Sequence, residues 1–153
     1  MKKVITIFLC LVILGLLFGC NESSKSLDNC SNLNQPDKDL CYGAVATASL
    51  DVLKCDKIFS SSLVWGCYTD IAIKTQNFSI CDKISDLDFK NACNRDTAIQ
   101  TKNELNCEKV FDLRNNEKSM CYLEISRKKN DKSICDKISG DALKQACLTA
   151  VPY

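Results

Sequence analysis

Cysteine is the residue type whose number and spacing could do chemistry in this chain. The sequence of 153 residues contains twelve cysteines and no histidine. Cysteines can bind a metal, act as a redox pair, carry a lipid or form structural disulfides. Ten of them alternate as two regular series, a first series of Cys30, Cys55, Cys81, Cys107 and Cys135 and a second series of Cys41, Cys67, Cys93, Cys121 and Cys147. This regularity favours a structural role.

Metal, redox and nucleophilic chemistry fit this spacing poorly. Zinc sites usually place two cysteines about two to four residues apart, and the sequence contains neither a Cys-x-x-Cys pair nor a Cys-x-x-Cys-His haem motif. Without histidine, the common Ser-His and Cys-His nucleophile pairs cannot form. The acidic residues and lysines recur in register beside the cysteines, whereas a catalytic site is normally unique. We therefore predict a protein that is not an enzyme and that uses no metal and no cofactor.

The first twenty residues, MKKVITIFLCLVILGLLFGC, are typical of a signal peptide, because two lysines precede a run of about fifteen apolar residues. Their end, LFGC at residues 17–20, resembles the bacterial lipobox. The resemblance implies that Cys20 becomes the N-terminus and carries lipid, so that the protein is exported and anchored to the cell membrane or the outer membrane. We expect residues 1–19 to be the signal peptide and residues 20–25 to be a short lipidated tether. Ordinary cleavage and an uncleaved anchor helix are the alternatives.

The exported part consists of about five copies of one repeat, with a period of about 26 residues. Four positions before each first cysteine stands a residue that can cap a helix: Ser26, Asp51, Asn77, Asn103 and Asp131. Three positions after each first cysteine stands an aliphatic residue on the same helix face: Leu33, Ile58, Ile84, Val110 and Ile138. After a polar break, a second amphipathic helix carries the second cysteine. The pattern predicts an all-α domain over residues 26–153, in which disulfide-stapled helical hairpins stack as a short α-solenoid and each first helix has about eight residues.

The hairpin geometry also predicts which cysteines pair. In the repeat at residues 77–103, Cys81 and Cys93 lie about six residues before and after the break, so they are level in an antiparallel pair of helices. Cys93 and Cys107 lie about nine and five residues from the next break and fit less well. An even number of cysteines in an exported chain also indicates disulfides. The predicted disulfides are Cys30–Cys41, Cys55–Cys67, Cys81–Cys93, Cys107–Cys121 and Cys135–Cys147.

Aromatic residues are the remaining candidates for a binding site. Tyr42, Tyr68 and Tyr122 each directly follow a second cysteine. Equivalent positions in a stacked array form a ladder, so these tyrosines either pack between neighbouring repeats or form a strip that binds a peptide or a glycan. Trp65, the single tryptophan, lies two residues before Cys67. The sequence leaves open whether Trp65 belongs to the core or to the surface.

Over residues 26–150 the repeats resemble helical-hairpin units of the tetratricopeptide and Sel1-like kind, and most of all the cysteine-rich Sel1-like proteins. The period of the repeats in this chain is shorter than the roughly 34–40 residues of those families, and the Gly/Ala/Tyr signatures of those families are missing. The resemblance implies an architecture with a surface for protein or peptide contact, and it carries over no specific function. We expect a membrane-anchored cell-envelope lipoprotein that acts as an interaction module. A protective surface protein without a specific ligand, or an inhibitor of an envelope-directed enzyme, is the alternative.

Nucleic acid is not an expected partner. The chain has a formal net charge of +1, and its longest basic run is Arg127-Lys128-Lys129. Nucleic-acid binding depends largely on a concentrated set of lysines and arginines that neutralise phosphates. We therefore expect a protein or peptide partner, together with the membrane that holds the lipid on Cys20.

Overall fold

The computed structural model describes residues 29–112 and 116–151, and every regular element in these two ranges is a helix. In each repeat a short first helix precedes a longer second helix. The short helices are η1 (Cys30–Asn32), α3 (Val52–Cys55), η2 (Phe78–Lys83), η3 (Glu104–Lys109) and η4 (Lys132–Lys137). The longer helices are α2 (Asp37–Ser49), α4 (Ser61–Thr75), α5 (Leu87–Thr101), α6 (Glu117–Lys129) and α7 (Asp141–Ala150). The predicted fold class, an all-α array of disulfide-stapled repeats, is therefore confirmed.

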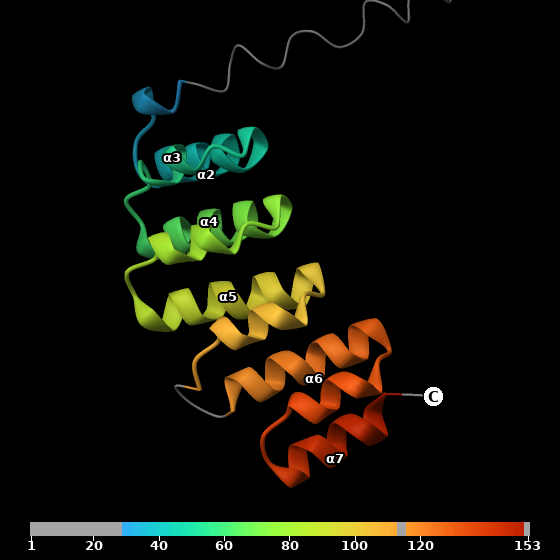
Figure 1. Ribbon diagram of the computed structural model, residues 1–153. Coiled ribbons are helices and arrows are strands. Elements are labelled where there is room, and N and C mark those ends of the chain that lie inside the picture. The colour runs from blue at the N-terminus through green and yellow to red at the C-terminus, as the bar shows by residue number, and fades with distance from the viewer. Residues whose placement is uncertain (1–28, 113–115, 152–153) are drawn as a thin grey trace, which may run out of the picture.

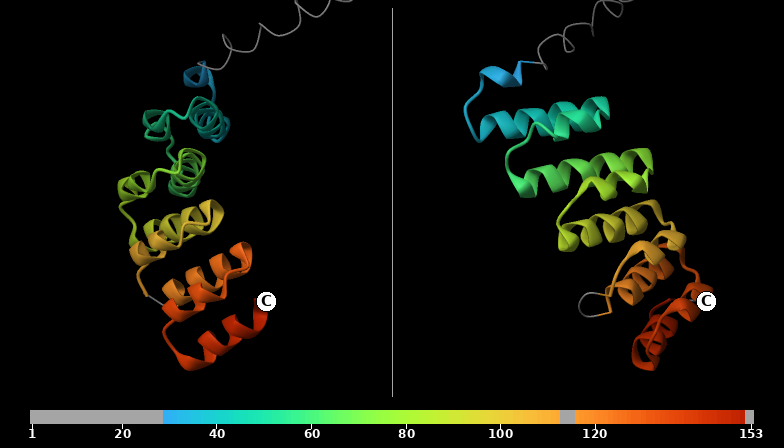
Figure 2. Two further views of the ribbon diagram at one scale, coloured as in Figure 1. Left: turned by 45° about the vertical axis from the view of Figure 1, so that its right-hand side comes forward. Right: turned by 60° about the vertical axis from the view of Figure 1, so that its left-hand side comes forward.

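The repeats stack into an elongated, twisted column (Figure 1). The longer helices follow one another down the stack, and each short helix lies beside them. The helix axes turn progressively along the column, so that α2 is seen lengthwise in one view of Figure 2 and end-on in the other. The turns that lead from the first to the second helix of a repeat all lie on one side of the column, at the left of Figure 1. We call this side the turn side.

The predicted capping residues begin the short helices. The side chains of Asp51, Asn77, Asn103 and Asp131 each accept a hydrogen bond from the backbone N–H two residues later. Ser26 lies outside the described residues. The short helices are shorter than the eight residues that the sequence predicts. Three of them have six residues in the 3-10 form, whose three residues per turn align the first cysteine with the aliphatic residue three positions later.

A tight turn joins each longer helix to the short helix that follows it. The residue after each of the first four longer helices has a left-handed backbone, with φ between 54° and 56°: Leu50, Gln76, Lys102 and Asn130. The next residue donates its backbone N–H to the carbonyl oxygen five positions earlier, as in Asn77 to Ala72 and Asn103 to Ala98, both at 3.0 Å. This hydrogen bond is that of a Schellman motif, which satisfies a carbonyl group at the helix end. The capping residue therefore closes one helix and starts the next.

The core lies along the axis of the column and consists mainly of cysteines, aliphatic residues and small residues. Five positions after the second cysteine, Ala46, Ala72, Ala98 and Ser126 are completely buried, so the helices can approach closely. Four of the five predicted aliphatic residues are also buried. Leu33 is 43% exposed, since the described residues contain no earlier repeat against which it could pack.

Five disulfides cross-link the two helices of each repeat, and they join the predicted pairs: Cys30–Cys41, Cys55–Cys67, Cys81–Cys93, Cys107–Cys121 and Cys135–Cys147. Their Cα–Cα distances, between 5.6 and 5.8 Å, are close to the usual value for disulfides. Disulfides persist in oxidising compartments, so this framework indicates a location outside the cytoplasm. No helix in residues 29–112 and 116–151 is both long enough and apolar enough to span a membrane.

Candidate binding site

The tyrosines after the second cysteines do not form an exposed strip, so that interpretation is wrong. Tyr68 and Tyr122 are only 5% and 1% exposed. Each hydroxyl donates a hydrogen bond to the acidic residue after the first cysteine of its own repeat, Asp56 for Tyr68 and Glu108 for Tyr122. Burial, and then the hydrogen bond to Asp56, raise the pKa of Tyr68 to about 12. These tyrosines are packing residues, which is the other interpretation that the sequence allowed.

Tyr42 occupies the same position in the first repeat and is half-buried. The ammonium group of Lys57, from the next repeat, lies 5.5 Å from the centre of its ring. Lys137 lies over the ring of Tyr122 in the same way, at 5.7 Å. The lysine two residues after a first cysteine therefore covers an aromatic ring of the preceding repeat, and this cation–π contact favours stacking of the repeats.

The acidic residues after the first cysteines mostly pair with lysines of their own repeat. Lys90 contacts Asp82 at 2.8 Å, and Lys144 contacts the equivalent Asp136 at the same distance. The carboxylates of both pairs are largely exposed to solvent, so each pair contributes little to stability. These residues support the repeat architecture. Among the described residues, no group of three or more histidine, cysteine or acidic side chains could hold a metal ion.

Neighbouring repeats are held together by a polar contact that the sequence did not reveal. The residue two positions before the second cysteine bonds the backbone of the next repeat on the turn side. Asp39 accepts hydrogen bonds from the N–H groups of Phe59 and Ser60, both at 2.9 Å, and the first of these is the main cause of its lowered pKa. Asn91 accepts from the N–H of Phe111 at 2.7 Å and donates to its carbonyl at 2.9 Å.

The same contact recurs further down the column, where Ser119 accepts from the N–H of Ser139 at 3.2 Å. We call this recurring contact the inter-repeat clamp. It escapes sequence analysis because aspartate, asparagine and serine share the role, so the position shows no constant residue type. The only available signal was the shared place in the repeat, two residues before the second cysteine.

Trp65 occupies the clamp position between the second and third repeats and breaks the pattern. Its ring stacks on that of Phe89 in α5, with ring centres 5.2 Å apart. The indole nitrogen Nε1 of Trp65 and the hydroxyl of Thr69 are buried and have no hydrogen-bond partner in the described part of the chain. Aromatic packing therefore replaces the polar clamp at this junction.

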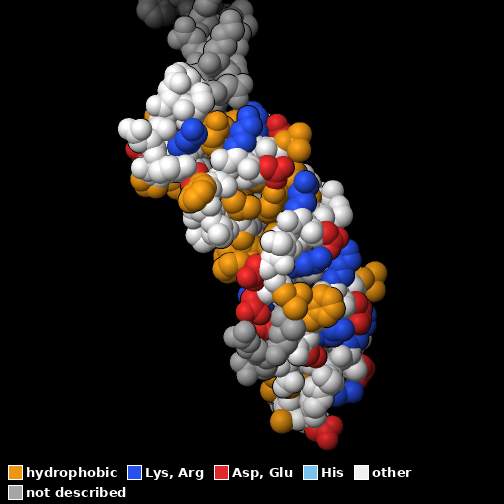
Figure 3. Space-filling view, turned by 90° about the vertical axis from the view of Figure 1, so that its left-hand side faces the viewer, with side chains coloured by type: hydrophobic (Ala, Val, Ile, Leu, Met, Phe, Trp, Pro, Cys, Tyr) orange, Lys and Arg blue, Asp and Glu red, His pale blue; other side chains and the backbone are white. Residues whose placement is uncertain are grey.

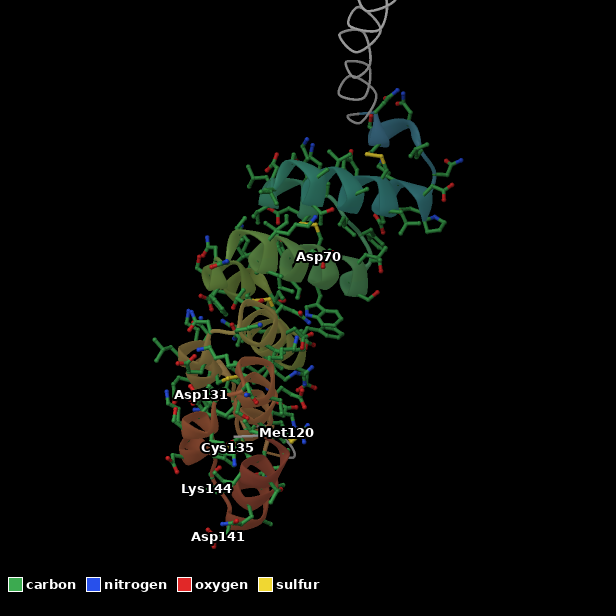
Figure 4. The ribbon with its side chains drawn as sticks, turned by 90° about the vertical axis from the view of Figure 1, so that its right-hand side faces the viewer. Asp70, Met120, Asp131, Cys135, Asp141 and Lys144 are labelled. Atoms are coloured by element: carbon green, nitrogen blue, oxygen red, sulfur yellow. A yellow bond between two sulfur atoms is a disulfide. The ribbon has the colours of Figure 1, made fainter. Side chains whose placement is uncertain are left out.

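Two grooves lie between longer helices on either side of this junction. One, of about 270 Å³, lies between α2 and α4 and includes Gly43, Gly66 and Asp70 in its lining. The other, of about 350 Å³, lies between α5 and α6 and includes Arg95 and Met120. Figure 4 shows Asp70 on α4 and Met120 on α6. Equivalent positions of the repeat line both grooves, because Gly43 and Arg95 each stand two residues after a second cysteine and Gly66 and Met120 each stand one before.

Large apolar side chains are exposed next to these grooves on the turn side. Phe59 is 87% exposed, and Phe111 occupies the equivalent position two repeats later with 52% exposure. Leu87, at the start of α5, is half exposed. Figure 3 shows separate hydrophobic patches on this face, most of them in its upper half, among polar and charged side chains. Large aromatic side chains exposed to this extent are candidates for contact with a partner.

The fold and these surfaces define the class of protein: a disulfide-stapled helical repeat array with an exposed apolar side. Comparisons with protein-family models, with curated proteins and with solved structures found no match to this chain. Cys20, the predicted lipidation site, lies outside the described residues, as do both predicted boundaries at residues 19 and 25.

Proposed function

We propose that this protein is an exported lipoprotein, anchored through Cys20, whose repeats bind a protein or peptide partner. The observation that carries the proposal is the exposed apolar turn side, above all Phe59 and Phe111 beside the inter-helix grooves. Exposing such residues to water is unfavourable by roughly 25 cal/mol for each Å² of apolar surface. A stack of repeats also offers an extended surface of the kind that repeat proteins use for binding.

The anchoring half of the proposal is supported by the LFGC sequence at residues 17–20 and by the oxidising location that the disulfides indicate. Cys20→Ala should remove the lipid attachment point, so the protein should leave the membrane fraction. We would measure its distribution after washing the membranes with carbonate. Protein that stays bound in this variant would instead support an uncleaved anchor helix.

The binding half is tested by photocrosslinking in intact cells. A photoreactive benzoylphenylalanine at Phe59 samples the turn side. The same group at Lys102 lies in the turn between α5 and η3, and Figure 1 shows this turn on the opposite edge of the column. The proposal expects one discrete adduct from position 59 and much less of it from position 102. The absence of an adduct at position 59 would favour a surface protein without a specific partner.

A further inference from the structure

The groove between α2 and α4 is anionic. Asp39 and Asp70 belong to its lining, and no lysine or arginine of the described chain lines it. Asp39 is only 3% exposed, and its hydrogen bonds with the backbone N–H groups of Phe59 and Ser60 lower its pKa, so it is ionised at neutral pH. Asp70 is exposed and has neither an ion pair nor a hydrogen bond within the described ranges. The groove therefore presents negative charge without a cation of its own.

Acidic residues at the position of Asp70 are compensated in the two following repeats. This position lies three residues after the second cysteine. Asp96 of α5 contacts Arg95 at 3.1 Å, and Glu124 of α6 contacts Arg127 at the same distance. Asp70 of α4 has no such arginine. Its carboxylate is therefore available to a cation from another molecule.

Lys74, one turn further along α4, does not compensate Asp70. The two side chains lie on one face of the helix, because they are four residues apart. The ammonium group of Lys74 instead donates a hydrogen bond to the carbonyl oxygen of Thr47 at 3.2 Å. Thr47 lies close to the C-terminal end of α2. This contact holds the cation at one end of the groove, away from the glycine-lined part.

Two glycines keep large side chains out of this groove. Gly43 and Gly66 occupy the positions that Arg95 and Met120 take in the α5–α6 groove. A Cβ atom at Gly66 would meet nothing within 4 Å, and one at Gly43 would meet Cδ1 of Ile58 at 3.7 Å, an ordinary contact. The α5–α6 groove is thus lined by a cation of the protein itself, whereas the α2–α4 groove has room for a cation from a partner.

The size and walls of the groove suit a single long side chain. Its volume of about 270 Å³ lies below the range of about 300–1,000 Å³ that is usual for small-molecule sites. Leu40 and Leu63 contribute apolar surface to the lining, and Leu40 is 55% exposed. Lysine and arginine bury their methylene stems against such surface while the charged group stays in a polar environment. Phe59, which is 87% exposed, adjoins the groove through its backbone contact with Asp39.

We propose that the α2–α4 groove binds a lysine or arginine side chain of the protein partner. The stem lies along Gly43 and Gly66, and the cationic group pairs with Asp70. Complementary charge of this kind contributes mainly to the specificity and the rate of association. The inference rests on the proposed function and specifies what the partner must present: a basic residue next to an apolar residue that contacts Phe59.

The experiment selects peptides from a random twelve-residue phage-displayed library on the disulfide-bonded protein. Peptides that also bind Gly66→Met are removed, because this uncharged substitution copies Met120 and obstructs the groove. The peptides that remain should contain lysine or arginine. As synthetic, blocked peptides measured by calorimetry, they should bind Asp70→Asn about two- to fivefold more weakly than the original protein, and added salt should weaken binding to the original protein. Gly43→Arg places a cation of the protein in the groove and should weaken binding by more than about tenfold.

Glu124→Gln is the matched control, because it removes the carboxylate at the equivalent position of the α5–α6 groove. Binding should be unchanged in this variant. Thermal unfolding should show that Gly66→Met and Gly43→Arg still fold, since a Cβ atom has room at both positions.

Remaining peptides without a basic residue, or peptides that bind Asp70→Asn as tightly as the original protein, would overturn the site. Failure to obtain any peptide that depends on the groove would overturn it as well. The proposed function would survive each of these results if crosslinking at position 59 gave an adduct, and it would fail only if that adduct were also absent.

Discussion

The inter-repeat clamp makes its sharpest prediction at Asn91. This side chain is 3% exposed and forms two hydrogen bonds with the backbone of Phe111 in the next repeat, at 2.7 and 2.9 Å, and a third with Glu117. Asn91→Ala removes all three. At about 0.5–1.5 kcal/mol for each backbone hydrogen bond, the junction between α5 and α6 should lose about 1–3 kcal/mol.

Hydrogen exchange of the Phe111 amide is the appropriate assay, because repeat arrays can open locally at one junction. A loss of about 1–3 kcal/mol corresponds to an exchange rate about five to 150 times faster. Amides in α2, whose clamp is Asp39, should be unaffected. Asn91→Ser copies the residue that performs this role in α6 and should retain part of the protection.

Asn106→Ala is the matched control, because Asn106 lies in η3 away from the clamp position. It should leave the Phe111 amide protected. The reasoning would be refuted if Asn91→Ala left the exchange of Phe111 unchanged, or if protection fell equally in all repeats. The second outcome would mean that the column unfolds as one unit and that the clamp is not a local contact.

Three further predictions concern the disulfides, the buried tyrosines and the turns between repeats. Replacing Cys81 and Cys93 together by serine should lower the free energy of unfolding, measured by urea denaturation, by about 2–3 kcal/mol. Thiol labelling of this variant should find no free cysteine, and labelling of Cys67 would contradict the pairing. The pKa of Tyr68, about 12, lies above the unfolded value of about 10, so the contribution of the tyrosine to stability is complete below pH 10 and is lost as the pH rises to 12. Tyr68→Phe should therefore reduce the loss of stability at alkaline pH, measured by unfolding curves at a series of pH values. An identical loss in the variant would contradict this role of Tyr68. Lys102→Gly should raise the free energy of unfolding by about 0.5–1 kcal/mol, because glycine tolerates φ of 54°; a decrease would show that the Lys102 side chain is needed.

Much of the architecture could be predicted from the sequence because it depends on contacts within one repeat. Helix capping by Asn77 and Asp131 and the burial of the cysteines arise from residues close together in the chain. The pairing of Cys81 with Cys93 could be predicted for the same reason, since two helices joined by a short break have only one level register. The sequence alone therefore established the helical class, the period and the disulfide framework.

The contacts between repeats could not be predicted, because they depend on how far each repeat is rotated against the next. That rotation places Asp39, Asn91 and Ser119 on the turn-side backbone of the following repeat, although their residue types differ. The packing of the repeats also buries Tyr122 and stacks Trp65 on Phe89. Sequence determined the repeat unit, whereas the tertiary structure decided which of its faces is buried and which is free to bind.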